Sequence, residues 1–308
     1  MNWNKSRSET LPREEMLTTN TQKKIGLVVE GGGMKCAYNA GILDAFLDEG
    51  ITFDYCIGAS AGSANLASYL AGQRGRNIRF YTKWIKNPEF FGKKSFLKTG
   101  DLFGLHYIYG TLTNSTGKDP INYQAIMDNP SEFELVATDA KTGKPVYFDK
   151  SVMKQDDYRA IMASSAIPAA CHPIQIGKDR YYDGGVSDAI PCQRALDKGC
   201  DKLVVITSKP RDYVKEPEAH KKLYHALCAK YPATIKDLDR RHIMYKQEQD
   251  LMFDLEKKHK AFIFAPSEHL PMSTTSMDPK ENEQLYSLGM YDYVKLNKAF
   301  QAFIEDAR

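Results

Sequence analysis

Short apolar runs alternate with stretches of helical periodicity along the first two thirds of the chain. Residues 25–29 form a compact apolar run, and from Met34 to Leu47 apolar residues recur at three- and four-residue spacings, as on one face of a helix. Another apolar run, 53–59, precedes a second helical stretch that ends near Leu70. Two strand–helix units in tandem predict neighbouring parallel strands joined by right-handed crossovers.

Similar patterns continue to about Ser208 and complete an α/β body. Turn residues at 141–144 and 177–179 each separate two short β-rich runs, which predicts hairpins. We expect strands at 133–138, 145–148, 174–176, 180–182 and 202–207, and helices at 77–85, 157–164 and 191–196. The aromatic residues and glycines of 87–118 fit either a cap over a pocket or ordinary loop packing.

The pattern changes after Pro210. Residues 221–260 are charged and helical in period, 261–264 form a short apolar run, and 280–304 are again helical. We therefore expect residues 209–308 to form a mostly helical extension packed on the body, with Glu248, Asp250 and Asp254 on a solvated helix face. Residues 1–24 are polar and lack the apolar stretch of a signal peptide, which predicts a flexible N-terminal segment.

The composition narrows the classes of function. The 308 residues carry a formal net charge of +3, too small to indicate a surface for nucleic acid. Six cysteines without a C-x-x-C pair are typical of reduced thiols, so we expect a cytoplasmic protein. No apolar run approaches the ~20 residues of a membrane span, and contact with a membrane would be peripheral. The Cys and His spacing matches no zinc site, so neither a metal nor a cofactor is expected.

The segment Gly58-Ala59-Ser60-Ala61-Gly62 follows a predicted strand and opens a predicted helix. A nucleophile elbow of the form G-x-S-x-G needs this context, because its sharp turn exposes the serine hydroxyl between residues with little or no side chain. The alternative is a turn of small residues in which Ser60 caps the helix.

A glycine run, Gly31-Gly32-Gly33, comes directly after the first strand. Glycines let backbone N–H groups approach a ligand, as an oxyanion hole requires. A tight strand-to-helix connection and a dinucleotide phosphate loop are the alternatives. The dinucleotide motif needs glycine where Cys36 stands and an acid at the end of the second strand, whereas Asp54 lies near its start.

The third motif is Asp183-Gly184-Gly185, which follows the strand predicted at 180–182. Two glycines let the backbone turn sharply and leave the aspartate carboxylate free to point across a sheet edge. An ordinary surface turn is the alternative.

Taken in this order, the three motifs resemble the patatin-like phospholipases. Two further blocks agree, namely the small residues 163–168 that end in proline and residues 186–191 after the D-G-G turn. The resemblance covers roughly residues 25–208 and implies a three-layer α/β/α fold with a mainly parallel central sheet. Residues 209–308 are similar to the C-terminal extension of a bacterial subgroup at Tyr245, 264–266 and 285–289.

This resemblance implies a Ser–Asp dyad, with Ser60 as the nucleophile and Asp183 as its base. The oxyanion loop would be Gly31, Gly32 and Gly33. Lys35 matches a basic position of the family, and the supporting glycines are Gly58, Gly62, Gly184 and Gly185. The family usually has glycine directly after the basic residue, where this chain has Cys36.

Such a dyad implies a hydrolase of lipid esters, of the phospholipase A or lysophospholipase type, that works through an acyl-enzyme. An aspartate with an ordinary pKa of about 3.9 is a poor base for serine, so we expect Asp183 to be partly buried and within hydrogen-bond reach of Ser60. The substrate would be a phospholipid, a lysophospholipid or another lipid ester.

Two alternatives remain beside the dyad. A triad in the order Ser…Asp…His could use a histidine after Asp183, and the candidates are His220, His225, His242, His259 and His269. Most of these lie in charged helical stretches, and Ser60 comes early for that fold. The other alternative is a catalytically silent lipid-binding or regulatory protein on the same fold.

Overall fold

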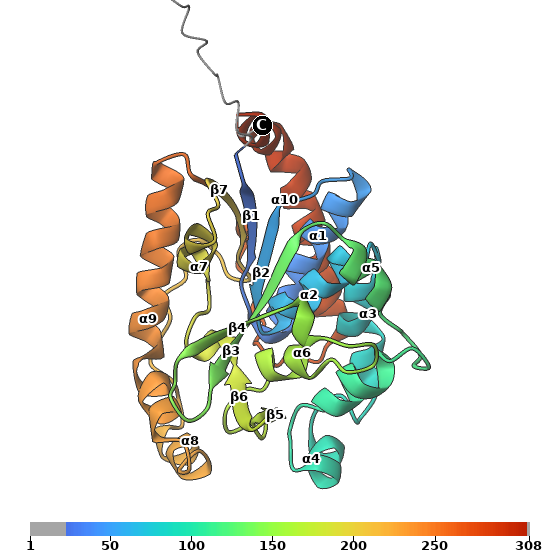
Figure 1. Cartoon of the computed structure of the whole chain (residues 1–308), viewed down its shortest axis with the longest axis vertical. Coiled ribbons are helices and arrows are strands. Elements are labelled where there is room, and N and C mark those ends of the chain that lie inside the picture. Colours follow the sequence, from blue (N-terminus) through green and yellow to red (C-terminus); the bar gives the residue numbers. More distant parts are fainter. Residues whose placement is uncertain (1–22, 307–308) are drawn as a thin grey trace, which may run out of the picture.

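The computed structural model describes residues 23–306, so the flexible segment expected at 1–24 falls, except for its last two residues, outside the described residues. A single sheet runs through the centre of the molecule (Figure 1). Its strand order is β5-β6-β3-β2-β1-β7-β8, with β4 beside β3. The strands are β1 (Ile25–Val29), β2 (Tyr55–Ala59), β3 (Glu132–Asp139), β4 (Pro145–Asp149), β5 (Ile174–Ile176), β6 (Asp179–Asp183), β7 (Lys202–Ile206) and β8 (Ala261–Phe264).

The sheet is mainly parallel, as predicted. Strands β3, β2, β1, β7 and β8 run parallel to one another. The other three, β4, β5 and β6, pair antiparallel to their neighbours, and the two predicted hairpins account for β3–β4 and β5–β6. The strand expected at 261–264 is β8, which extends this same sheet beside β7.

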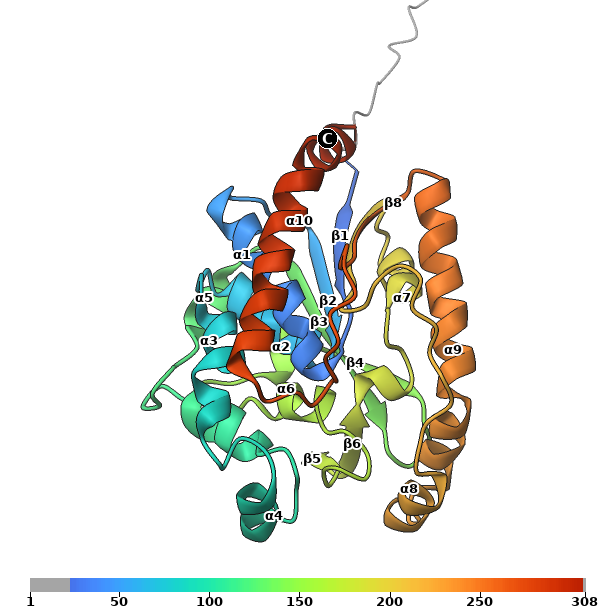
Figure 2. The same cartoon turned by 180° about the vertical axis from the view of Figure 1, so that it is seen from behind.

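Helices cover both faces of the sheet and make three layers (Figures 1 and 2). One face carries α1 (Ala37–Asp48), α2 (Ala61–Leu70), α3 (Arg76–Thr82) and α10 (Pro279–Glu305), and the other carries α7 (Cys192–Asp197) and α9 (Pro232–Lys257). Successive side chains of a strand point to opposite faces. Accordingly Leu27 and Val29 join the core under α1 and α10, whereas Val28 joins the core under α7 and α9.

The prediction of one long helix over residues 221–260 is wrong. The chain forms two helices there, α8 (Lys221–Leu227) and α9, and α9 begins at Pro232. Proline is tolerated in the first turn of a helix but would clash with a preceding turn, so it separates the two. The remaining helices are α4 (Lys93–Thr99), α5 (Tyr123–Asp128), α6 (Arg159–Ser164) and a π-helical segment (His106–Leu112).

The extension is held to the body by close packing of α10 against α1. Gly41 of α1 and Gly289 of α10 face each other, and a Cβ on Gly41 would lie 3.2 Å from the Cα of Gly289. Two glycines at the crossing point let the backbones of the helices approach. Around them, Phe46 stacks on Phe300 at a ring distance of 5.3 Å, which buries the apolar face of α10.

The six cysteines are buried free thiols. Within residues 23–306, no helix is both long and apolar enough to cross a bilayer.

Candidate active site

Ser60 occupies the turn between β2 and α2. Its backbone has φ 54° and ψ −130°, a conformation that residues with a Cβ rarely adopt. The turn sets the serine at the N-terminus of α2, where the helix dipole favours negative charge. The N–H of Ser60 donates to Ser164 Oγ at 2.9 Å and so ties the turn to α6. A strained serine between a strand and a helix is the arrangement of a nucleophile elbow.

Close packing requires the glycines of the G-x-S-x-G motif and the first glycine of the D-G-G motif. A Cβ on Gly58 would lie 2.8 Å from the carbonyl carbon of Gly62, and a Cβ on Gly62 would lie 2.5 Å from the Val29 oxygen. Any side chain there would push α2 away from the ends of β1 and β2. Gly184 likewise packs directly on the Val136 carbonyl, which sets the D-G-G turn against β3.

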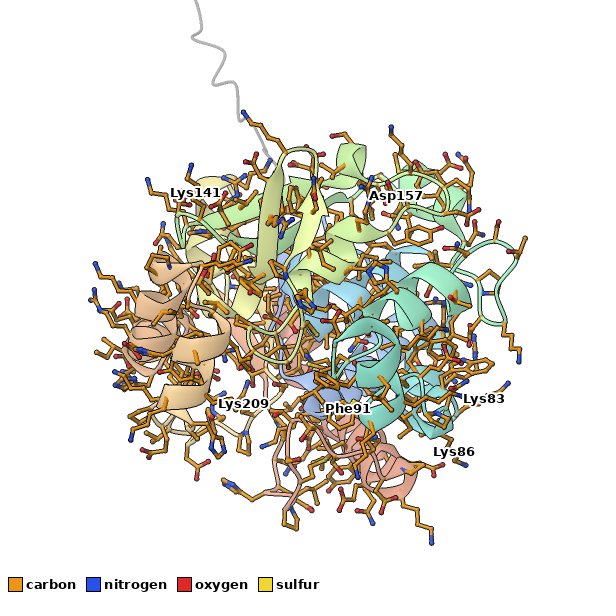
Figure 3. The ribbon with its side chains drawn as sticks, turned by 90° about the horizontal axis from the view of Figure 1, so that it is seen from below. Lys83, Lys86, Phe91, Lys141, Asp157 and Lys209 are labelled. Atoms are coloured by element: carbon orange, nitrogen blue, oxygen red, sulfur yellow. The ribbon has the colours of Figure 1, made fainter. Side chains whose placement is uncertain are left out.

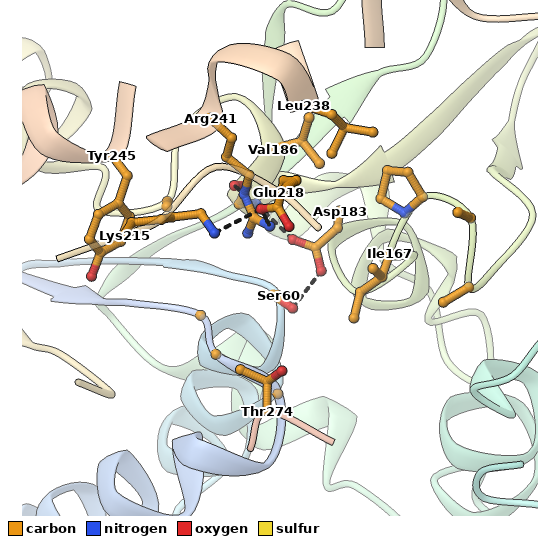
Figure 4. A pocket seen from close by; sticks show the side chains of 18 of the residues that line it. Ser60, Ile167, Asp183, Val186, Lys215, Glu218, Leu238, Arg241, Tyr245 and Thr274 are labelled. Atoms are coloured by element: carbon orange, nitrogen blue, oxygen red, sulfur yellow. Dashed lines mark hydrogen bonds and ion pairs between the residues drawn. The ribbon is translucent and has the colours of Figure 1, made fainter. Parts of the chain in front are cut away.

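Asp183, the last residue of β6, lies beside Ser60 (Figure 4). The register of the strands explains why Ser60 and Asp183 lie close together. Ala59, just before Ser60, pairs with Val136 of β3, and Asp183 pairs with Ala137, the next residue of β3. Ser60 Oγ donates to Asp183 Oδ2 at 2.6 Å.

The Asp183 carboxylate is almost fully enclosed, with 4% of the residue exposed. Its second oxygen, Oδ1, accepts from the N–H of Gly185 at 2.8 Å. Burial raises the pKa of this carboxyl, while the hydrogen bond from Ser60 and the positive charges of Arg241 and Lys209 oppose the rise. A carboxylate with a raised pKa takes a proton from a hydroxyl more readily than a solvated aspartate does.

Gly31, Gly32 and Gly33 follow β1 and line the same cavity as Ser60. A Cβ on Gly31 would lie 2.8 Å from the Ser60 Cβ, so only a glycine backbone fits beside the serine. Ser208 Oγ donates to the Gly31 oxygen at 2.9 Å. Because the C=O and N–H of a trans peptide point in opposite directions, this bond turns the N–H of Gly32 away from Ser208.

A buried carboxylate anchors the glycine loop to the C-terminal part of the chain. Glu30 immediately precedes the loop and is 0% exposed. It accepts hydrogen bonds from the Tyr245 hydroxyl at 2.8 Å, from the N–H of Ser208 at 2.7 Å and from the Lys209 ammonium. A buried charge is tolerated only when it is paired and hydrogen-bonded, so these contacts fix the loop relative to α9 and the end of β7.

One face of α9 contacts the glycine loop, the turn at Gly185 and residues 189–190. Besides Tyr245, which holds the glycine loop, Arg241 Nε donates to the Gly185 oxygen at 2.6 Å. Glu248 lies two turns after Arg241, and its Oε2 accepts from both N–H groups of residues 189–190 at 3.0 Å each. The spacing of the three residues along the sequence puts them on one side of the helix, and that side fixes the turn after Asp183 and the glycine loop relative to each other.

Two cavities meet at Ser60. The larger, of about 400 Å³, is lined by apolar side chains, among them Ile167, Val186 and Leu238, and by charged side chains from the C-terminal part of the chain, for which we call it the charged cavity. Glu218 is one of these charged residues and is paired with Lys215 at 2.7 Å and with Arg241 at 3.0 Å (Figure 4). Lys209 is another lining residue.

The smaller cavity, of about 80 Å³, is lined mainly by apolar and aromatic side chains. These include Met34, Ala61, Ala64, Phe80, Tyr81, Phe90, Phe103, Leu105, Ile108 and Tyr109. A buried arginine, Arg76, also contributes, but its guanidinium is occupied by Ser68, Thr113 and the Asp119 oxygen. Gly33, Ser60, Phe103 and Ile167 line both cavities, so the serine lies at their junction.

Cys36, the departure from the family pattern, lies behind the glycine loop. It is fully buried, and its sulfur faces the Glu30 oxygen at 3.6 Å. Neither of the two cavities at Ser60 is lined by it. The neighbouring Lys35 is half-buried, and burial together with the charge of Lys209 lowers its pKa.

Two of the histidines considered for a Ser…Asp…His triad pair with acids other than Asp183. His225 pairs with Asp239 at 3.0 Å and His269 with Asp212 at 2.9 Å. His220 lines the outer part of the charged cavity. Among the hydrogen bonds of the described residues, the side chain of Ser60 has Asp183 as its partner.

Comparison with known proteins agrees with this geometry. A family model described as patatin-like phospholipase matches residues 27–196, more than half of the chain. The chain belongs to the patatin-like phospholipase family. Its patatin-like domain carries all three motifs, with Ser60 and Asp183 inside the matched range.

Curated relatives of this patatin-like chain are longer. The uncharacterized protein YjjU of Escherichia coli is 31% identical over 202 residues, which are 65% of this chain and 56% of that protein. An uncharacterized NTE family protein of Mycobacterium tuberculosis is 22% identical over 190 residues, or 61% of this chain and 50% of that protein. The chain thus spans about half the length of the curated relatives it matches.

Among solved structures, human GIVD cytosolic phospholipase A2 in complex with methyl gamma-linolenyl fluorophosphonate has a similar fold. The TM-score is 0.51 at 10% identity, over 93% of this chain and 59% of that chain. At such low identity the likeness concerns the fold alone. A second family model, for a domain of unknown function (DUF6363), matches residues 231–305, which include α9, β8 and α10.

The sequence did not predict that residues of α9 contact the loops around Ser60 and Asp183. The interpretation of Glu248 as part of a solvated helix face is wrong, although Asp250 and Asp254 are exposed. Burial and the neighbouring Asp188 raise the pKa of Glu248. A signal existed in the sequence, because Arg241, Tyr245 and Glu248 share a helix face with Leu238 and Met252, which are buried.

Proposed function

We propose that the protein is a serine acyl hydrolase that cleaves lipid carboxylic esters through Ser60 and Asp183. The observation that carries the proposal is the 2.6 Å hydrogen bond from Ser60 Oγ to the buried Asp183 carboxylate, made at a strained strand–helix turn. Membership of the patatin-like family supports a lipid substrate. The proposed reaction is of the phospholipase A or lysophospholipase type.

In the first half of the reaction, Ser60 Oγ attacks the ester carbonyl as its proton passes to Asp183. The carbonyl oxygen becomes an oxyanion, for which the N–H groups of Gly31, Gly32 and Gly33, which line the cavity, are the proposed donors. Preorganised donors of this kind are often the largest single catalytic contribution. Asp183 then returns the proton to the leaving alkoxide, and the acyl group remains on Ser60.

In the second half, Asp183 removes a proton from a water molecule, which attacks the acyl-enzyme. The second tetrahedral intermediate collapses, the fatty acid leaves, and the proton on Asp183 returns to Ser60. The same carboxylate thus acts as base and acid in turn. Because it has no histidine intermediary, its burial and its fixed contact with Ser60 are essential.

The substrate would lie across Ser60, with its acyl chain in the apolar cavity and its polar portion in the charged cavity. Burial of apolar chain surface favours the apolar cavity at roughly 25 cal/mol per Å². Lys209 of the other cavity pairs with Glu30, and Lys215 and Arg241 pair with Glu218. Their remaining N–H groups are the donors that would meet the phosphate or hydroxyl groups of a lipid head. We propose that the enzyme reaches such lipids from the aqueous side of a membrane.

Ester hydrolysis by three variants tests the proposal. We expect Ser60→Ala and Asp183→Asn each to lower kcat/KM on a short-chain nitrophenyl ester by roughly a thousand-fold or more, because the members of a catalytic unit act together. Asp179→Asn, at the exposed start of the same strand, is the matched control and should keep the wild-type rate. Melting temperatures of all three should stay within a few degrees of wild type.

Two results would count against the mechanism. A wild-type protein that hydrolyses neither the nitrophenyl ester nor lysophospholipid would support the catalytically silent alternative. Full activity of Asp183→Asn, with loss of activity in His220→Ala, would transfer the role of base to a histidine.

A further inference from the structure

Two short helices project from the end of the molecule at which the charged cavity lies. α4 and α8 lie at the same end in both views of the fold (Figures 1 and 2). Figure 3 shows the molecule from that end. Phe91, just before α4, lies on one side, α8 lies on the other, and Lys209, which lines the charged cavity, lies between them. We call α4 and α8 with their flanking residues the two arms.

Both arms expose large apolar side chains to solvent. On the α4 arm, Phe96 is 52% exposed, Leu97 86% and Leu102 39%, and on the α8 arm Leu223 is 56% and Leu227 58% exposed. Single exposed apolar residues are common on protein surfaces. Five of them gathered on two projecting arms at one end are unusual and are typical of an interaction site.

The arms are continuous with the cavity. Leu223 itself lines the charged cavity. On the other side, the N–H of Leu102 donates to the oxygen of Ala170, a lining residue, at 2.8 Å, and the next residue, Phe103, lines both cavities. An apolar molecule bound between the arms would therefore have an apolar route to Ser60.

Lysines surround the apolar tips. Lys93, Lys94 and Lys98 are exposed on the α4 arm, where Glu89 is the acid that pairs with Lys94 and Lys98. On the α8 arm, Lys221, Lys222 and Lys230 are exposed, and Asp239 pairs with Lys221 and His225. Each arm therefore keeps an excess of positive charge around its apolar residues.

We propose that the two arms form a docking surface for an anionic phospholipid bilayer. Apolar side chains inserted at the depth of the headgroups, ringed by lysines, are the recognised means by which a surface helix binds anionic lipid. A fluid bilayer can accommodate two separate seven-residue helices with a cavity between them, whereas a folded partner would need a matching two-pronged shape. This inference rests on the proposed function, since it names the surface from which the lipid ester enters the cavity.

Vesicle binding by full-length protein tests this surface. The variant Leu97→Asp/Leu227→Asp places one carboxylate on each arm and leaves the residues that line the cavities unchanged. The matched control is Tyr291→Asp/Val294→Asp on α10, where the two side chains are 59% and 73% exposed outside the arms. The probe is sedimentation with phosphatidylcholine vesicles that contain phosphatidylglycerol, and with pure phosphatidylcholine vesicles.

We expect wild type and the α10 control to bind the anionic vesicles, with binding that weakens as salt rises. The arm variant should bind at least about ten-fold more weakly, since carboxylates replace the inserting side chains. It should lose hydrolysis of vesicle lipid to the same degree and keep the wild-type rate on a soluble short-chain ester. Equal vesicle binding by the arm variant and wild type, or no binding by wild type, would overturn the proposal and favour a protein partner.

The two proposals fail separately in this experiment. If wild type binds anionic vesicles through the arms but hydrolyses no ester, the docking surface stands and the proposed function falls. If wild type hydrolyses the soluble ester but the arm substitutions leave vesicle binding intact, the proposed function stands and the docking surface falls.

Discussion

The two cavities that meet at Ser60 are built from different parts of the chain and differ in chemistry. The apolar cavity is lined by residues 33–167, all within the patatin-like domain. The charged cavity takes much of its wall from residues 209–275, including Lys215, Glu218 and Arg241. Under the proposed function the two parts would divide the work, in that the body would hold an acyl chain and the extension would determine what surrounds the polar side of the ester.

Of the substitutions that test the difference between the two cavities, the largest effect is expected in the apolar cavity. Ala64 of α2 lines it, and Ala64→Phe would fill the space of about three methylenes, each worth ~0.8 kcal/mol of burial. We expect kcat/KM on long-chain esters to fall about fifty-fold, while that on an acetyl ester stays near wild type. The readout is kcat/KM on nitrophenyl esters of increasing chain length.

The matched control is the same substitution on the other side of the serine. Ala219→Phe, at the exposed rim of the charged cavity, should leave the chain-length profile unchanged. A similar loss on long chains in both variants would contradict the assignment of the two cavities.

A smaller effect is expected from Arg241, which contacts the Asp183 turn from the charged side. Its charge lowers the pKa of Asp183 against the rise caused by burial, so Arg241→Gln should raise that pKa further. Asp183 must be deprotonated to act as a base, and activity therefore rises with pH through its pKa. The acid limb of the kcat/KM profile should move to higher pH, with a loss that is greatest at low pH.

Arg241→Lys separates charge from hydrogen bonding, because it keeps the positive charge and loses the guanidinium geometry. We expect its acid limb to stay close to that of wild type, even if its maximal rate is lower. An acid limb that is unmoved in Arg241→Gln would show that Arg241 has no electrostatic influence on the base.

The features recovered from the sequence were those encoded over short stretches. The parallel strands before Gly31 and before Ser60 follow from apolar runs, and the turns follow from glycines whose neighbours leave no room for a Cβ. The identification of Ser60 and Asp183 as a pair came from the order of motifs. Their proximity depends on the register of β2, β3 and β6, which no local pattern specifies.

The contacts missed in the sequence were long-range and polar. Glu30 and Tyr245 are 215 positions apart, and Arg241 reaches a carbonyl 56 positions away. A charged residue on a helix is ordinarily solvated, so Glu248 was assigned to the surface. Only the packing of α9 on the sheet shows that its polar residues contact Glu30 before the glycine loop and the turn after Asp183.

Covalent labelling is the most direct test of the central claim, that Ser60 is a nucleophile activated by Asp183. Wild-type protein would be treated with an alkyl fluorophosphonate, and the intact mass and the modified peptide would be determined. We predict a single adduct on Ser60, no adduct in Ser60→Ala, and much slower labelling of Asp183→Asn. An unmodified wild-type protein, or an adduct that persists in Ser60→Ala, would contradict the account.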